Sequence, residues 1–397
     1  MNHPSPTVPA PLTEPPRTQC RTFVPRGPTA ARALGVFAAV RIAGLLAVSV
    51  AAHATEQNTF RLLGRSWDSR WYTAIATDGY GRTLHFENAV VQSDLAFFPL
   101  YPGLIRAVTT ITPLTYGAAG LVVSWLAAGA AALGIYSLAV RLYDHRTATV
   151  LVLLWGLLPH SVILSMAYTE PVLTALAVWA LYAVHTGRWL WAGSLAVLAG
   201  LARPNGFAVA AAVLAAAGYE VWRRRGRHVP HRLWTGALLA PLGWAGYVLW
   251  VGARKGDLLG GYFAVQRGWG SRFDFGAGSL TFVRHLLRDG DKLVFSMTLV
   301  IVAVAVLLYA LLVAERAPLP LLVYTGVLLL ITVGGSGFFE SKPRFLLPAF
   351  PLLIPVALAV TRTAKARPRA AYLVVGALAG LSVAYGTYLV TIARMPL

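Results

Sequence analysis

Long runs of apolar residues recur along the whole chain and are separated by short polar links. Many runs are near the roughly 17–25 residues that a helix needs to cross a bilayer. The pattern therefore predicts an all-α, polytopic transmembrane helix bundle that crosses the membrane about eleven times. The clearest runs are residues 33–52, 117–140, 147–165, 234–251, 293–314 and 371–392.

The composition excludes an ordinary soluble domain. Hydrophobic residues make up 57% of the 397 residues and charged residues 12%, about half the charged fraction of a typical soluble protein. We predict a disordered, basic tail at residues 1–30, followed by one transmembrane domain at residues 31–397. The single cysteine, Cys20, lies in that tail, so the chain cannot form an internal disulfide.

The first apolar run ends in Ala-His-Ala at residues 52–54, a pattern typical of signal-peptidase cleavage. The length of the run and the extended basic segment before it favour an uncleaved first span. We therefore expect a multi-pass protein of the cell membrane, while cleavage after this run stays the alternative.

The net charge of +19 first suggests a nucleic-acid partner. The arginines and lysines, however, lie mostly in the short links between apolar runs, where the positive-inside rule places them. We therefore expect no nucleic-acid partner and predict a cytosolic N-terminus. This orientation puts two long loops, at about residues 54–116 and 253–292, on the outer face of the membrane.

Two interruptions refine this topology. Residues 95–108 are apolar but contain Pro99 and Pro102, and counting them as a span would invert every later loop. We interpret them as a helix or re-entrant segment in the outer interface. Residues 203–206, Arg-Pro-Asn-Gly, disfavour a continuous helix and predict a break at the outer end of two short helices.

The first long loop holds the densest group of chemically useful side chains. A carboxylate between aromatic residues at a membrane interface can act as a general base, because partial desolvation raises its basicity. The alternative is structural: the aromatic residues form an interfacial belt, and Asp68 pairs with Arg70 or caps a helix. The candidates are Asp68 as the catalytic residue and Trp67, Arg70, Tyr72, Asp78, Tyr80 and Asp94 as substrate-binding residues.

Further polar residues fall at outer positions of later segments. Taken singly, each has a simpler interpretation as a helix cap, an interface anchor or an ion-pair partner. Together they predict one outer cavity in which arginines bind a phosphate and carboxylates contact a hydroxyl. These further substrate-binding candidates are Glu170, Arg203, Asn205, Gln266, Trp269 and Arg344.

Several motifs are missing from the sequence. It has neither a Gly-rich phosphate loop nor a Cys/His cluster with metal-ligand spacing. An ATP-driven pump or a zinc protease is therefore unsupported, and we predict no cofactor and no metal ligand. Dependence on a divalent cation is left open.

The first loop resembles a known family. The sequence W-D-S-R-W-Y-T-A-I-A-T-D-G-Y at residues 67–80, followed by A-F-F-P-L-Y-P at 96–102, is similar to the first outer loop of the PIG-V mannosyltransferase family. Weaker similarities follow in the same order: Y-T-E at 168–170, R-P-N-G at 203–206 and K-P-R-F-L-L-P at 342–348. Pro204 and residues 81–95 depart from the family pattern, which bears on the acceptor more than on the reaction.

The resemblance implies a GT-C architecture and an inverting sugar transferase. Its donor would be a polyprenyl-phosphate mannose or related hexose, its acceptor a glycolipid or a protein, and its active site would be extracytoplasmic. The family's first-loop aspartate corresponds to Asp68, which would act as the general base. Two alternatives remain: a transporter or flippase of a lipid-linked sugar, and an assembly protein or another GT-C enzyme, such as an arabinosyl or protein O-mannosyl transferase.

Overall fold

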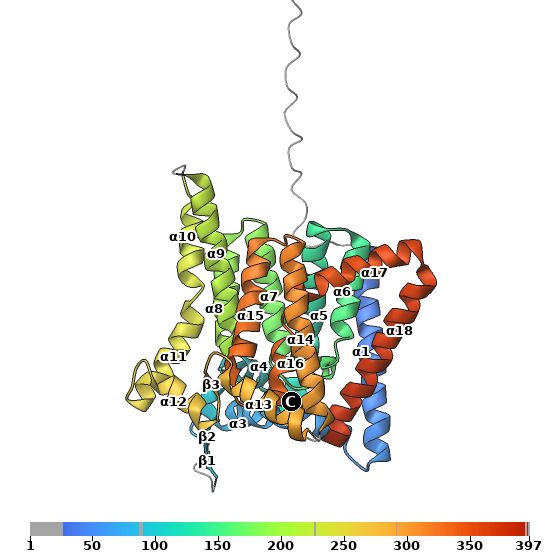
Figure 1. Ribbon diagram of the computed structural model, residues 1–397. Helices are drawn as coiled ribbons and strands as arrows, with labels where there is room; N and C mark the ends of the chain where they lie inside the picture. Colours follow the sequence, from blue (N-terminus) through green and yellow to red (C-terminus); the bar gives the residue numbers. More distant parts are fainter. Residues whose placement is uncertain (1–26, 87–89, 226–227, 291, 394, 396–397) are drawn as a thin grey trace, which may run out of the picture.

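The computed structural model is a bundle of roughly parallel helices with short elements gathered at one end (Figure 1). It describes residues 27–86, 90–225, 228–290, 292–393 and 395. Most of the predicted tail therefore lies outside the described residues, and the first helix already begins at Pro28. The all-α transmembrane bundle predicted from the sequence is confirmed.

Within the described residues, six helical segments are long and apolar enough to cross a membrane, so the chain is a multi-pass membrane protein. A bent pair, Phe339–Phe345 with Phe350–Ala366, counts as a seventh span if its two parts, which differ in direction by 77°, cross together. The count of about eleven stays a prediction. The six segments are α1 (Pro28–Ala54), α5 (Tyr116–Leu142), η3 with α9 (Pro204–Gly206, Phe207–Arg224), α10 with α11 (His231–Leu239, Leu242–Lys255), α14 (Leu293–Ala314) and α18 with η6 (Pro368–Tyr388, Leu389–Ala393).

Shorter helices fill the middle of the bundle. The apolar run at 147–165 is not one helix, because its first part ends at Gly156 and a 3₁₀ turn follows. Pro159 explains the interruption, since proline disfavours helical geometry in the residue before it. The break predicted at 203–206 is confirmed between α8 and α9. The shorter elements are α6 (His145–Gly156), η2 (Ser161–Ser165), α7 (Glu170–His185), α8 (Trp189–Ala202) and α15 (Leu319–Gly334).

Close helix contacts in the bundle depend on small residues. A Cβ on Gly193 of α8 would lie 2.3 Å from the carbonyl oxygen of Gly236 in α10. Only glycine allows the two backbones to approach this closely, as is common between membrane helices. The same helices bury a large apolar core with α5, α7, α9 and α15, rich in alanine.

The long loops fold into short elements at one end of the bundle, the lower end in Figure 1. The segment predicted to lie in the interface, residues 95–108, overlaps a 12-residue helix, Leu100–Ile111, that is among neither the long nor the shorter apolar spans. Two antiparallel strand pairs, which the sequence did not predict, brace this end: β1 (Thr83–His85) with β2 (Val91–Ser93), and β3 (Arg272–Phe273) with β4 (Gly335–Ser336). The helices here are α2 (Thr59–Gly64), α3 (Asp68–Asp78), η1 (Asp94–Ala96), α4 (Leu100–Ile111), α12 (Gly261–Gly268) and α13 (Ala277–Asp289).

The loops predicted to share one face are in direct contact. The β3–β4 pair joins the second loop to the segment after α15, and the Trp269 indole donates to the carbonyl oxygen of Ser93 at 2.9 Å. That segment continues through η4 (Phe339–Ser341), α16 (Lys342–Phe345), η5 (Phe350–Leu353) and α17 (Ile354–Ala366). Residues from both loops and from the bent pair therefore meet at this end of the molecule.

Candidate active site

The start of α3 places the first-loop aspartate. Asp68 is the first residue of the helix, and Trp67 before it has a φ of 49°. A bulky residue at positive φ costs about 1–3 kcal/mol and persists only where its surroundings enforce it. The Trp67 side chain packs against the main core, which holds this turn in place. The chain thus enters α3 through a strained residue directly before the candidate base.

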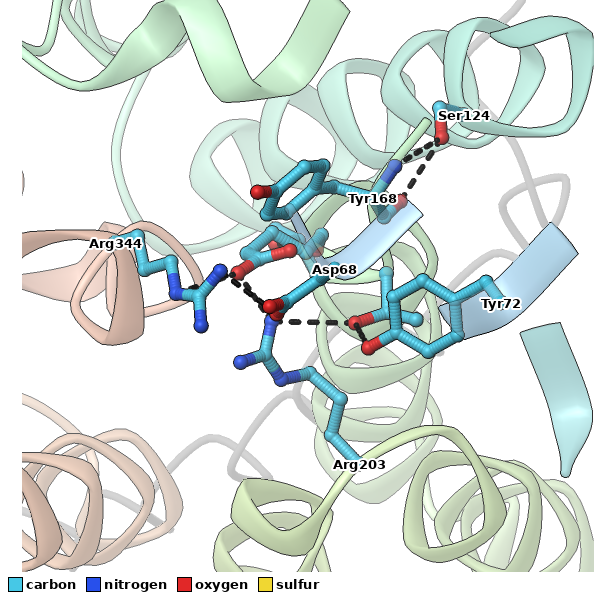
Figure 2. Close-up of polar contacts among 9 residues, drawn as sticks. Asp68, Tyr72, Ser124, Tyr168, Arg203 and Arg344 are labelled. Atoms are coloured by element: carbon cyan, nitrogen blue, oxygen red, sulfur yellow. Dashed lines mark hydrogen bonds and ion pairs between the residues drawn. The ribbon is translucent and has the colours of Figure 1, made fainter. Parts of the chain in front are cut away.

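Asp68 forms an ion pair with an arginine from the opposite end of the sequence. The Arg344 Nη1 lies 2.8 Å from Asp68 Oδ2, and Figure 2 shows the two side chains meeting from α16 and α3. The Asp68 side chain is 17% exposed and that of Arg344 9%. The predicted alternative that Asp68 pairs with Arg70 is wrong, because Arg70 Nε donates instead to the Arg65 carbonyl oxygen at 3.1 Å.

A second carboxylate lies behind this pair. Glu170, the first residue of α7, is fully buried and forms an ion pair with Arg203, which follows α8. Arg344 Nε lies 3.8 Å from the same carboxylate. Two carboxylates and two guanidinium groups therefore form a cluster with no formal net charge, consisting of Asp68, Glu170, Arg203 and Arg344. We call it the ionic cluster.

Hydroxyl and aromatic groups line the ionic cluster. The Thr169 hydroxyl accepts from Arg203 Nη1 at 3.2 Å and lies 3.3 Å from the Tyr72 hydroxyl. The Arg344 guanidinium carbon is 5.4 Å from the centre of the Tyr168 ring, within cation–π range. Burial raises the pKa of the Tyr72 hydroxyl well above its usual value. Tyr72 therefore stays protonated at neutral pH.

The arrangement suits a reaction at a phosphate-bearing substrate. Guanidinium groups bind phosphate oxygens through paired hydrogen bonds, and a partly exposed carboxylate can take a proton from a hydroxyl group. Asp68 is the more accessible of the two carboxylates, whereas Glu170 is completely enclosed. Accessibility thus separates the carboxylate that can contact a substrate from the one that holds the arginines.

Two other first-loop candidates support the loop instead of joining the ionic cluster. Asp94 is buried, and its Oδ2 accepts from the backbone N–H groups of Gly81 and Arg82, both at 2.8 Å. The Tyr80 hydroxyl donates to the Phe97 carbonyl oxygen at 2.8 Å, and burial raises the pKa of Tyr80 to about 12. Both side chains fix the path of the chain between α3 and α4.

The second long loop contributes an aromatic layer next to α3. Trp269 contacts Trp71 and Phe97 edge-on, with ring centres 5.1 and 5.3 Å apart. Gln266 Nε2 donates to the Tyr262 hydroxyl at 2.8 Å within α12. These predicted residues therefore lie beside the first loop, packed against its aromatic side chains.

Three predicted residues stand apart from the ionic cluster. Arg70 and Asp78 are exposed on α3, and Asp78 lies at the end of that helix farthest from Asp68. Asn205 is buried in η3, two positions after Arg203. The structure thus brings together Asp68, Tyr72, Glu170, Arg203 and Arg344 of the predicted set.

Three residues close in sequence to members of the ionic cluster were not among the candidates. Tyr168 and Thr169 precede Glu170 in the Y-T-E motif, and that adjacency was the available signal. Lys342 is buried, and its Nζ donates to the Gly335 carbonyl oxygen at 2.7 Å, which fixes α16 against the end of α15. Lys342 belongs to the K-P-R-F motif, but its contact with Gly335 could not be predicted from the sequence.

Metal-ligand geometry gives no further candidate. Among the described residues, no three His, Cys, Asp or Glu side chains form a group that could hold a metal ion. We therefore assign no metal ligand.

Comparisons with known proteins show the fold. The sequence matches no protein-family model and no curated protein. The apo structure of ArnT from Cupriavidus metallidurans is similar, with 16% identity over 85% of this chain and 62% of ArnT and a TM-score of 0.51. The Archaeoglobus fulgidus oligosaccharyltransferase, in complex with Zn and sulfate, has 15% identity over 87% of this chain and 53% of its own, with a TM-score of 0.49.

ArnT is a GT-C glycosyltransferase, and the chain has the GT-C type of fold. It spans only about 60% of the length of ArnT. The resemblance to the PIG-V family rests on the sequence motifs alone.

Proposed function

We propose that this protein is a membrane glycosyltransferase with a polyprenyl-phosphate-linked sugar donor, in which Asp68 is the general base. The finer assignments are also proposals: mannose or a related hexose as the sugar, and a glycolipid or protein as the acceptor. We also propose that the N-terminus is cytosolic and that the ionic cluster lies on the extracytoplasmic face. The residues proposed to bind substrate are Trp67, Tyr72, Arg203 and Arg344.

One observation carries the proposal: a partly exposed carboxylate, Asp68 at the start of α3, meets the buried Arg344. An acceptor hydroxyl can approach a carboxylate that is 17% exposed, and the ion pair with Arg344 fixes its orientation. Glu170 holds Arg203 and Arg344 from behind. A negatively charged donor phosphate would compete with Asp68 for Arg344, which places donor and base side by side.

The proposed reaction is an inverting displacement. Asp68 accepts the proton of the acceptor hydroxyl group, while the oxygen of that hydroxyl group forms a bond to the sugar C1. The bond between C1 and the phosphate oxygen breaks, and the lipid phosphate leaves with the bonding electron pair. Arg344 and Arg203 stabilise the negative charge that develops on this leaving group. The proton removed from the acceptor hydroxyl group stays on the Asp68 carboxylate and is then transferred to solvent.

The fold supports the enzyme over a transporter. ArnT, whose fold this chain shares, is recorded in a complex with undecaprenyl phosphate. A transporter is expected to carry ionisable groups at the centre of its spans, whereas the ionic cluster lies where the long loops meet the bundle. Arg41, at the middle of α1, is the exception. The mannose assignment is supported only by the sequence resemblance, chiefly the motifs at 67–80 and 96–102.

The test is sugar transfer in membranes that contain Asp68→Asn, with polyprenyl-phosphate mannose as donor. Loss of a general base lowers turnover by about 10²–10⁴-fold, and we expect a loss in this range. Asp78→Asn is the matched control, because it makes the same change at the opposite end of α3, and we expect transfer close to wild type. Product analysis should show inversion at C1.

Equal transfer by Asp68→Asn and wild type would contradict the catalytic assignment. Transfer with another lipid-linked hexose but not with mannose would replace the sugar and keep the mechanism. Movement of intact lipid-linked sugar across the membrane without any transfer would favour the flippase instead.

A further inference from the structure

The end of the bundle opposite to the ionic cluster carries a basic and aromatic surface. Residues 219–234 join the end of α9 to the start of α10, and Figure 1 shows the two helices reaching beyond their neighbours at the upper end. The α3 and α16 helices, which carry Asp68 and Arg344, lie toward the lower end. The proposed reaction uses no residue of the segment 219–234.

Basic residues dominate this segment. It contains five arginines and two histidines but only one acidic residue, Glu220. The Glu220 carboxylate is already paired, because Arg224 Nε lies 2.9 Å from it and Arg223 Nη2 lies 3.2 Å from it. No carboxylate of the described residues forms an ion pair with Arg225 or Arg232, and both residues are exposed. The segment therefore carries positive charge that the described part of the chain does not neutralise.

Exposed aromatic side chains accompany the arginines. Tyr219, Trp222 and Trp234 are 49%, 64% and 51% exposed. The Arg225 guanidinium carbon lies 6.0 Å from the centre of the Trp222 ring, and the Tyr219 and Trp222 ring centres are 5.8 Å apart. Tryptophan and tyrosine are enriched where a membrane meets water, because each has an apolar ring and a polar group. The aromatic side chains therefore indicate a surface at the level of the lipid head groups.

The position of the segment agrees with this environment. The candidate spans on either side of it are Pro204–Arg224 and His231–Lys255, so its arginines lie at or near the ends of two spans. Exposed apolar side chains continue along both helices toward the middle of these spans, at Leu214 and Leu238. A soluble acidic protein would match the charge of the segment, but only a lipid also matches the apolar side chains below it.

We propose that this surface binds the head groups of anionic phospholipids. Guanidinium groups bind phosphate oxygens, and basic residues beside a membrane span attract anionic lipids. The proposal does not rest on sugar transfer by the ionic cluster. We call the surface the α9–α10 patch, and its residues are Tyr219, Trp222, Arg223, Arg225, Arg232 and Trp234.

The experiment measures lipid binding by the full chain in a neutral detergent, using native mass spectrometry. The probes are dioctanoyl phosphatidylglycerol, which is anionic, and dioctanoyl phosphatidylcholine, whose head group has no net charge. We expect saturable binding of phosphatidylglycerol that is at least about tenfold tighter than binding of phosphatidylcholine. An aromatic belt without a head-group site predicts equal binding of the two lipids.

The double variant Arg225→Gln with Arg232→Gln should weaken phosphatidylglycerol binding by about tenfold or more, because each basic residue near an anionic surface contributes about fivefold. The matched control is Arg284→Gln with Arg288→Gln. It removes the same charge from exposed positions of α13, at the lower end of the bundle (Figure 1), and should bind like wild type.

Thermal unfolding without lipid should be the same for the wild type and both double variants, since the four arginines are exposed. Arg232→Glu alone keeps the test valid if the double variant in the α9–α10 patch does not fold, because it changes only the α10 side. This single variant should weaken phosphatidylglycerol binding by about fivefold or more.

Equal binding of the two lipids by wild type would overturn the proposal. Equal weakening of phosphatidylglycerol binding by the two double variants would also overturn it, since net charge would then explain the affinity. Binding of polyglutamate without binding of phosphatidylglycerol would replace the lipid with an acidic protein partner.

Discussion

Asp68 and Asp94 are acidic residues of the same loop, yet the structure gives them different partners. Asp68 meets the Arg344 guanidinium and is partly exposed, whereas Asp94 is buried and accepts two backbone N–H groups of its own loop. Asp94 therefore has the contacts of a residue that holds the chain, and Asp68 those of a residue that a substrate can reach. The partner of each side chain, more than its residue type or sequence motif, distinguishes the candidate catalytic residue from the residue that stabilises the loop.

The largest expected effect comes from Glu170→Ala, which removes the carboxylate behind the Asp68–Arg344 pair. Two buried arginines then lose a partner, and breaking a buried ion pair costs about 3–5 kcal/mol. Thermal unfolding in mild detergent should show this loss, together with loss of transfer. Glu220→Ala is the matched control, because Glu220 pairs with Arg223 and Arg224 near the surface of α9, where such pairs contribute about 0–1 kcal/mol. Equal destabilisation by both variants would contradict the buried cluster.

Asp94→Ala should have the next largest effect, on stability alone. Two backbone N–H groups lose their acceptor, which costs about 1–3 kcal/mol when the groups stay buried. Unfolding measurements and proteolysis of the loop between α3 and α4 would detect the change. Transfer per folded molecule should stay near that of wild type, and a specific loss of turnover at full stability would move Asp94 into the active site.

A smaller change is expected for Tyr72→Phe, which sharpens the description of the ionic cluster. It removes one buried hydroxyl that lies 3.3 Å from Thr169, and a neutral hydrogen bond contributes about 0.5–1.5 kcal/mol. Stability should fall within that range. Because burial raises the pKa of Tyr72, the variant should leave the pH profile of transfer below pH 10 unchanged. A shifted profile would mean that Tyr72 titrates during the reaction.

Arg70→Gln is expected to have the smallest effect. Arg70 is exposed and donates to a neighbouring backbone carbonyl group, and surface changes of this kind usually stay within about 0.5 kcal/mol. Both stability and transfer should match wild type. A large loss of sugar transfer would instead support the pairing of Asp68 with Arg70, which the structure does not contain.

The sequence predicted the fold class well, because membrane spans leave a strong apolar pattern. It also predicted the break at 203–206 from proline and glycine. It did not predict the break after Gly156, because the apolar run continues beyond the end of α6. Arg41 donates a hydrogen bond to the Gly156 carbonyl oxygen at this break. Pro159 was the available signal for this interruption, but the continuous apolar pattern hid it.

The ionic cluster was predictable only in part. Asp68, Glu170, Arg203 and Arg344 were candidates because charged residues near a membrane are costly and therefore informative. Their pairing was not predictable, since Asp68 and Arg344 lie in segments far apart in the sequence. The neighbouring Arg70 was the more obvious partner and was wrong.

The most direct test compares single-turnover transfer by Asp68→Asn and Asp94→Asn, each corrected for the fraction of folded protein. Both variants remove one carboxylate from the same loop. Asp68→Asn should slow the chemical step by about 10²–10⁴-fold, and Asp94→Asn should leave it close to wild type. Equal rates in the two variants, or a slower step in Asp94→Asn, would contradict the assignment of Asp68 as the base.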